Sequence, residues 1–213
     1  SDKIMPLKDK IKAYGYEIEY PLQGYLGKIP ESTATKYKTH YDGGGIEFTT
    51  PKPLPYDKLV KSIRGIYKLC EKYADTRNFD IERDLFDSTS AGVHIRLDVS
   101  DWNKIERMRY CRLLSTDMQK YEDYIEWCTE NFRRPWNNYN SPVRYSYIRD
   151  CIVNDQNSNK FVNTKYEFWR YGQNVVTIEN RMFGVPENPD NAINEVHFIH
   201  KLCDIVDVSL TMA

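Results

Sequence analysis

The sequence predicts an α+β fold, in which a mainly antiparallel sheet is covered by helices on one face. Short segments that alternate apolar and polar residues predict strands, and longer segments with apolar residues three and four apart predict helices. The two kinds of segment do not alternate as the βαβ units of a parallel sheet require. No internal repeat or linker divides the 213 residues, so residues 1–213 are predicted to form a single domain.

Four strands are predicted from runs with a two-residue periodicity, each followed by a turn-forming residue. They cover about 14–20, 45–51, 92–99 and 174–183. The stretch FDIERDLFD, residues 79–87, fits either a short strand or a hairpin. Residues 21–44 are rich in Gly, Pro, Ser and Thr and predict a long connection. Residues 132–165 are rich in Asn, Arg and Tyr and predict a segment that is mostly loop.

Three helical stretches accompany the strands. The first covers about 55–74, where the apolar stripe consists of Leu59, Ile63, Ile66, Cys70 and Tyr73. The second starts at Ser100 or Asp101, either of which can cap it, and extends to about 131 with a break near Ser115. The third covers about 190–208, and its stripe consists of Ile193, Val196, Ile199, Leu202, Cys203 and Val206.

The composition restricts the class of protein. Lys+Arg 30 against Asp+Glu 31 gives a net charge of -1, so no overall positive field favours nucleic acid. The five cysteines are scattered and form no CxxC pair, which is typical of reduced thiols and not of disulfides or a zinc site. No segment approaches the roughly 20 apolar residues of a membrane span, and the charged first residues do not resemble a signal peptide. We expect a cytoplasmic protein without a membrane partner.

The polar sides of the four strands are unusual. If the apolar sides share the helix-covered core, all polar side chains point to the opposite face of the sheet. In YGYEIEY, residues 14–20, two glutamates thus lie side by side. The polar face as a whole collects Glu17, Glu19, Glu47, His94, Arg96, Asp98, Glu179 and Arg181.

Two interpretations of this polar face are open. One is an ordinary solvated face, which every one-sided antiparallel sheet has. The other follows from its composition, which is carboxylates with one histidine and two arginines and almost no lysine. Oxygen ligands with an occasional imidazole suit Mg²⁺ or Mn²⁺, and such ions together with arginines stabilise the charge of a phosphoryl group in transfer. The second interpretation predicts a metal-dependent phosphoryl-transfer site.

The order and wording of the four strands resemble the amidoligase family, which belongs to the glutamine synthetase-like superfamily of carboxylate–amine ligases. The resemblance is carried by four motifs, GYEIEYP, DGGGIEFTTPKP, SAGVHIRLD and VTIENRMFG, which span residues from about 14 to 184. The motif residues are Gly15, Glu17, Glu19, Asp42, Glu47, Gly92, His94, Thr177, Glu179 and Arg181. The resemblance implies a curved sheet like that of the glutamine synthetase catalytic domain, with the active site on its polar, concave face.

The resemblance also implies an activity. Such enzymes use ATP to activate a carboxylate as an acyl-phosphate, which an amine then attacks, and the products are an amide, ADP and phosphate. Metal ions that bridge ATP would be held by Glu17, Glu19, Glu47, His94 and Glu179, and Arg181 would stabilise the transferred phosphoryl group. The substrates would be a small-molecule or peptide carboxylate and an amine.

One residue departs from the family pattern. The strand motif of the family contains two histidines in H-x-H, and the second is replaced here by Arg96. Arginine does not ligate metals, so either one metal site is altered or Arg96 binds a phosphate or a substrate carboxylate. For the same reason, a non-catalytic binding protein that keeps this fold is an alternative, and a metal-dependent phosphoesterase or nuclease is another.

Further candidates lie outside the four motifs. The long loop is a candidate for a lid that grips a substrate or a phosphate through four arginines, Arg133, Arg134, Arg144 and Arg149. Similar candidates lie just before the fourth strand, namely Lys165, Tyr166 and Arg170. Each is also compatible with an ordinary surface position. His197 and His200 lie three residues apart beside the last apolar stripe, where packing is favoured over metal binding because no third ligand is near in sequence.

Overall fold

The computed structural model describes residues 5–20, 31–37, 40–42, 45–73, 92–116, 123, 126, 130–131, 140–159, 162–170 and 174–211. Its centre is a six-stranded sheet in the order β2-β3-β1-β4-β6-β5, and every neighbouring pair is antiparallel. The strands are β1 (Tyr14–Tyr20), β2 (His40–Asp42), β3 (Gly45–Thr49), β4 (Val93–Asp98), β5 (Thr164–Arg170) and β6 (Val175–Phe183). The fold is therefore α+β, as predicted.

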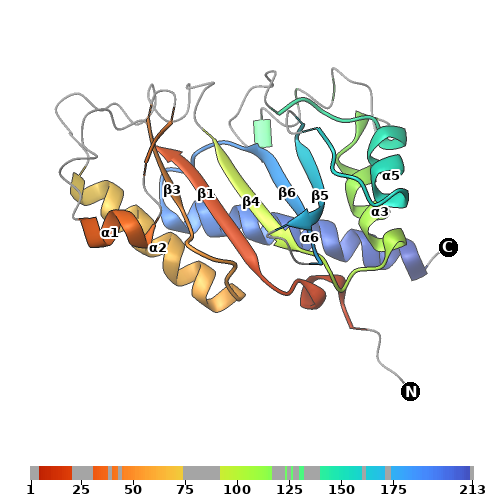
Figure 1. Cartoon of the computed structure of the whole chain (residues 1–213), viewed down its shortest axis with the longest axis horizontal. Helices are drawn as coiled ribbons and strands as arrows, with labels where there is room; N and C mark the ends of the chain where they lie inside the picture. Colours follow the sequence, from red (N-terminus) through yellow and green to blue (C-terminus); the bar gives the residue numbers. More distant parts are fainter. Residues whose placement is uncertain are drawn as a thin grey trace.

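Two long helices, α2 (Tyr56–Tyr73) and α6 (Pro189–Thr211), lie on the same face of the sheet (Figure 1). Two shorter helices, α3 (Lys104–Leu113) and α5 (Tyr145–Val153), pack against each other beside β5 at one edge. A 3-10 turn, η1 (Leu7–Lys10), precedes β1, and a short helix, α1 (Glu31–Lys36), precedes β2. Within the described residues, no helix is long and apolar enough to cross a membrane.

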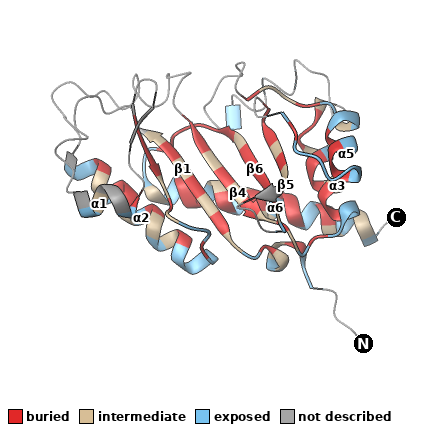
Figure 2. Ribbon diagram, in the orientation of Figure 1, coloured by how far each residue is buried: buried red, intermediate tan, exposed pale blue. Residues whose placement is uncertain are grey.

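The core lies between the sheet and the two long helices. The apolar side of β4 contributes Val93, Ile95 and Leu97, all fully buried, and the polar side of the same strand is only partly buried. The predicted stripes of α2 and α6 point to the same layer, and their residues from Leu59 to Cys70 and from Ile193 to Val206 are buried. Figure 2 shows the resulting bands of buried residues along strands and helices. Burial of these apolar side chains is the main stabilising contribution to the fold.

Several predicted boundaries need correction. Residues 21–44 are not only a connection, because α1 and β2 lie within them. Residues 132–165 contain two elements that were not predicted, α5 and the start of β5 at Thr164, although most of the described residues of this segment lie outside helices and strands, as predicted. Strand β3 ends at Thr49, two residues before Pro51, which has no N–H to continue the ladder. The predicted break near Ser115 is confirmed, since α3 ends at Leu113. The stretch 79–87 lies outside the described residues.

Register brings the polar side chains of different strands together. Glu17 of β1 is paired with His94 of β4, and Arg96 of β4 is paired with Glu179 of β6. Between Val93 and Ile95 the β4–β6 register shifts by one residue, which marks a β-bulge beside His94. Because directly opposed residues point to the same side of a sheet, these four side chains form a continuous polar row across the three central strands.

Candidate functional site

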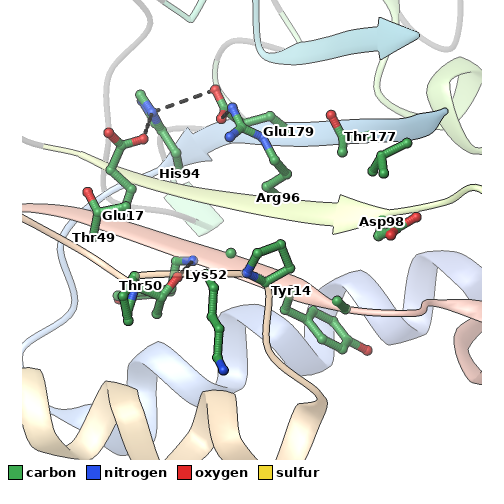
Figure 3. Close-up of a pocket in the computed structure, with 16 residues that line it drawn as sticks. Tyr14, Glu17, Thr49, Thr50, Lys52, His94, Arg96, Asp98, Thr177 and Glu179 are labelled. Atoms are coloured by element: carbon green, nitrogen blue, oxygen red, sulfur yellow. Dashed lines mark hydrogen bonds and ion pairs between the residues drawn. The ribbon is translucent and has the colours of Figure 1, made fainter. Parts of the chain in front are cut away.

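Glu17, His94 and Glu179 form a cluster at the centre of the polar face (Figure 3). The imidazole Nδ1 of His94 lies 3.1 Å from Glu17 Oε2 and 3.8 Å from Glu179 Oε1. One ligand atom from each of the three residues lies within 4.8 Å of the other two. Among the residues that the structure describes, no other group of His, Cys, Asp and Glu is arranged in this way.

Two arginines surround the third member of the cluster. Arg96 Nη2 donates a hydrogen bond to Glu179 Oε2, and Arg181 Nη1 donates one to Glu179 Oε1 at 2.9 Å. Glu179 is only 3% exposed. A buried carboxylate is stable only if it is paired and hydrogen-bonded, and the two guanidinium groups supply both conditions. Each oxygen of Glu179 therefore already accepts a charged hydrogen bond.

The distances in this cluster fit a small divalent cation. With metal–oxygen distances of about 2.1 Å, ligands of an octahedral ion lie about 3.0 Å apart when adjacent and about 4.2 Å apart when opposite. The two distances from His94 Nδ1, 3.1 and 3.8 Å, fall in or near this range. Two carboxylates with one imidazole suit Mg²⁺ or Mn²⁺, and the imidazole favours Mn²⁺. The residues present fit such an ion after small side-chain movements.

Electrostatics in the cluster favour the carboxylate form of Glu17. Burial raises the pKa of the Glu17 carboxyl group, but hydrogen bonds with His94 and Glu47 and the positive charges of His94 and Arg96 outweigh burial and shift this pKa downward. Glu47 is itself buried, with 7% exposed.

A pocket of about 340 Å³ extends from this cluster along β4. One end is lined by Glu17, His94 and Glu179, and the other by Asp98, Val175 and Thr177. Two buried polar atoms of the lining, Nε of Arg96 and Oγ1 of Thr177, have no hydrogen-bond partner within the described part of the chain. Buried polar groups of a folded protein are normally satisfied, so each of these two atoms has capacity for a further hydrogen bond.

The remaining predicted site residues are not members of the Glu17–His94–Glu179 cluster. Glu19 and Glu47 are paired across β1 and β3, one position further along the polar face. Lys165 is paired with Glu179 across β5 and β6, but its ammonium group lies 2.5 Å from Glu167 Oε1. Asp98 Oδ1 accepts hydrogen bonds from the backbone N–H and hydroxyl of Ser100, so it shapes the turn after β4.

Candidates from the long loop and the last helix are not part of the cluster. Arg170 ends β5, paired with Val175, and Arg144 precedes α5. Arg149 lies near Asp150 and over the Tyr145 ring on the exposed side of α5. Arg133 and Arg134 lie outside the described residues.

His197 and His200 hydrogen-bond the hydroxyl groups of Tyr56 and Tyr14, respectively. Of the two predicted roles for this pair, packing is therefore the one that these contacts support.

Two motif residues that line the pocket, Thr177 and Gly15, were given no role, and Glu167, the partner of Lys165, was not predicted. Thr177 belonged to a quoted motif, yet its buried hydroxyl was given no role. Gly15 lies opposite Arg96 on β1 and lines the pocket, and an added Cβ would lie 3.5 Å from the Arg96 Cβ. Glu167 follows Lys165 by two residues in TKYEFWR, and this alternation could have revealed both the strand and the pair.

Comparisons of the chain with protein-family models, with curated proteins and with solved structures found no match. The interpretation of the site consequently depends on its own geometry and on the four motifs.

Proposed function

We propose that this protein is a carboxylate–amine ligase that uses ATP and Mg²⁺, or Mn²⁺, to join an acid and an amine. The observation that carries the proposal is the row Glu17–His94–Arg96–Glu179 at one end of a pocket, in which metal ligands and guanidinium groups are adjacent. Phosphoryl transfer depends on positioning and on cations around the transferred group. This row places the ligands of a metal ion beside the positively charged guanidinium group of Arg96.

The residues of the row would have distinct roles. Glu17, His94 and Glu179 would hold the ion, with Glu19 and Glu47 available for a further ion on the same face. A metal–nucleotide complex supplies an activated phosphoryl group. Arg181, which donates to Glu179 at 2.9 Å, would add positive charge where charge develops on the phosphoryl oxygens.

The pocket suggests how a nucleotide would be oriented. Asp98 follows His94 by four residues on β4, which corresponds to about 13 Å along an extended strand. This length suits a nucleotide triphosphate whose phosphates lie at His94 and whose base lies toward Asp98 and Val175. The same distance is too long for an amine bound at Asp98 to react at the metal cluster. We therefore assign the end of the pocket near Asp98 to the nucleotide.

The overall reaction is balanced without any redox step. A carboxylate, ATP and an amine give an amide, ADP and inorganic phosphate. One oxygen of the carboxylate leaves with the phosphate, and the amine nitrogen forms the new bond to the carbonyl carbon and loses its proton.

The proposal is tested by measuring ADP release in the presence of Mg²⁺ and mixed panels of carboxylates and amines. We expect release that requires both an acid and an amine. Glu17→Gln and Glu179→Gln should each lower the rate by about 100-fold or more, the loss typical of a group that stabilises transition-state charge. Glu71→Gln, the same change at an exposed position of α2, is the matched control and should leave the rate unchanged.

Other outcomes would identify the alternatives. Hydrolysis of phosphate esters without ATP would indicate a metal-dependent phosphoesterase. Absence of nucleotide binding at millimolar ATP would favour a non-catalytic binding protein. Full ATP-dependent activity in either Glu17→Gln or Glu179→Gln would refute the assignment of the site.

A further inference from the structure

Arg96 occupies a position that joins the metal cluster to the rest of the pocket. On one side its Nη2 donates to Glu179 Oε2. On the other side it lines the same pocket as Thr177 and Asp98. Arg181 also donates to Glu179, but it is not among the residues that line the pocket. Of the two guanidinium groups on Glu179, Arg96 is thus the one that faces the ligand space.

The guanidinium group of Arg96 is only partly used in this arrangement. Nε and Nη2 lie on the same edge of a guanidinium fork, and this edge matches two oxygens of one phosphate or carboxylate. Here Nη2 is bonded to Glu179, whereas Nε is buried and lacks a partner in the described structure. Half of a bidentate edge is therefore satisfied, and a buried N–H without a partner is unfavourable.

A second unsatisfied group lies nearby. Thr177 is 3% exposed, and its Oγ1 has no partner among the described residues. Thr177 is paired with Asp98 across β4 and β6, two positions from the Arg96–Glu179 pair. The strand opposite Arg96 carries Gly15, so no side chain of β1 fills the space beside Arg96. Together, a donor edge, a hydroxyl and an open space form a receptor for an oxyanion.

We infer that Arg96 binds a phosphate group of the ligand by exchanging Glu179 for it, and that this exchange couples phosphate binding to metal binding. The identity of the anion as a nucleotide phosphate rests on the proposed function. While Arg96 stays on Glu179, it neutralises a metal ligand and competes with the ion for that carboxylate. When phosphate takes the Nε–Nη2 edge, Oε2 of Glu179 is released and becomes available to the ion. Such coupling is reciprocal, so each ligand strengthens binding of the other.

The inference is tested by measuring Mn²⁺ affinity, with electron paramagnetic resonance, at increasing inorganic phosphate. In the unchanged protein, phosphate should tighten Mn²⁺ binding by about 5- to 150-fold, the usual range of coupling between two sites. In Arg96→Gln, Mn²⁺ should bind more tightly than in the unchanged protein without phosphate, and phosphate should change its affinity less than twofold.

Two control variants distinguish the coupling of phosphate and Mn²⁺ binding through Arg96 from a general effect of removing an arginine charge. Arg181→Gln removes the other guanidinium from Glu179, so Mn²⁺ affinity should rise while its dependence on phosphate persists. Arg64→Gln makes the same change in an exposed pair with Asp190 and should alter neither quantity. If Arg96→Gln fails to fold by circular dichroism, Arg96→Lys keeps the charge without the fork and should still lose most of the phosphate dependence.

Equal phosphate dependence in the unchanged protein and the Arg96 variants would overturn the inference, and so would an absence of phosphate dependence in the unchanged protein. An effect of acetate as large as that of phosphate would overturn the identification of the anion as a phosphate. The measurement requires no turnover. Coupling in a protein without ligase activity would therefore support this inference and refute only the proposed function.

Discussion

Removal of the charge on Glu179 should destabilise the metal-free protein, although the same charge belongs to a cluster of carboxylates. Glu179 is 3% exposed and accepts hydrogen bonds from Arg96 and Arg181 on its two oxygens. In Glu179→Gln, the amide keeps one acceptor and turns a donor toward the other guanidinium. Two mostly buried cations then lose their counter-ion.

The magnitude follows from the burial of the three groups. Breaking a buried ion pair by removing one partner costs about 3–5 kcal/mol. The side chains of Arg96 and Arg181 keep 18% and 14% exposure, so water can solvate them in part, and we take the lower end, about 3 kcal/mol. For a chain of this length, each kcal/mol shifts the melting temperature by about 2–4 °C, which gives a decrease of about 6–12 °C.

Thermal unfolding by circular dichroism in EDTA is the suitable assay, and Glu71→Gln on the exposed side of α2 is the control, with an expected change below about 0.5 kcal/mol. Arg181→Gln should cause a smaller loss than Glu179→Gln, because Arg96 continues to pair with the carboxylate. An unchanged or higher melting temperature for Glu179→Gln would mean that repulsion among the carboxylates dominates, and it would refute the view that the arginines hold Glu179.

Three further predictions concern acid stability, the pocket and the core. Because the pKa of Glu17 is lower in the folded protein than its ordinary 4.5, its stabilisation is present above pH 4.5 and is lost as the pH falls toward the folded value. Glu17→Gln should therefore make metal-free stability fall less steeply below pH 4.5, and an unchanged slope in acid unfolding would contradict this. Gly15→Val should stay folded, since β-branched residues suit strands, but it should weaken nucleotide binding, measured by calorimetry, by at least about tenfold. Gly15→Ala should bind the nucleotide normally. Equal affinity of the two variants for the nucleotide would argue against the pocket as its binding site. Tyr110→Phe removes a 2.6 Å hydrogen bond to the fully buried Asn180. The free energy of unfolding, measured by urea denaturation, should fall by about 1–3 kcal/mol. An unchanged denaturation midpoint would contradict this prediction.

The two elements that were not predicted, α5 and β5, contain local signals of their own. In α5, Tyr145, Ile148 and Ile152 are spaced by three and four residues, and the two isoleucines are buried. In β5, Lys165 and Glu167 alternate with Tyr166 and aromatic neighbours. Both segments lie in or next to a stretch rich in Asn and Arg, and its overall composition favours a loop more strongly than these short periodic runs favour a helix or a strand.

The predicted site residues illustrate a different limit. The face to which Glu17, His94 and Glu179 point was predictable, because alternation along a strand is a property of the backbone alone. Their mutual distances were not, because the register of β1 with β4 and of β4 with β6 depends on packing between segments far apart in sequence. The partner of Lys165 was not predictable either. Its ammonium group forms an ion pair with Glu167, although the residue opposite it in the sheet is Glu179.

The sequence by itself determined the α+β class, the four motif strands, the apolar stripes of the two long helices and the residues of one polar face. Each of these follows from periodicities of two or about 3.6 residues, which the backbone geometry imposes locally. Only the tertiary structure decided that Arg96 and Arg181 both hold Glu179, and that the Nε of Arg96 is left unsatisfied beside an open pocket. Those facts depend on strand order, on a β-bulge beside His94 and on burial, which long-range packing sets and no local pattern encodes.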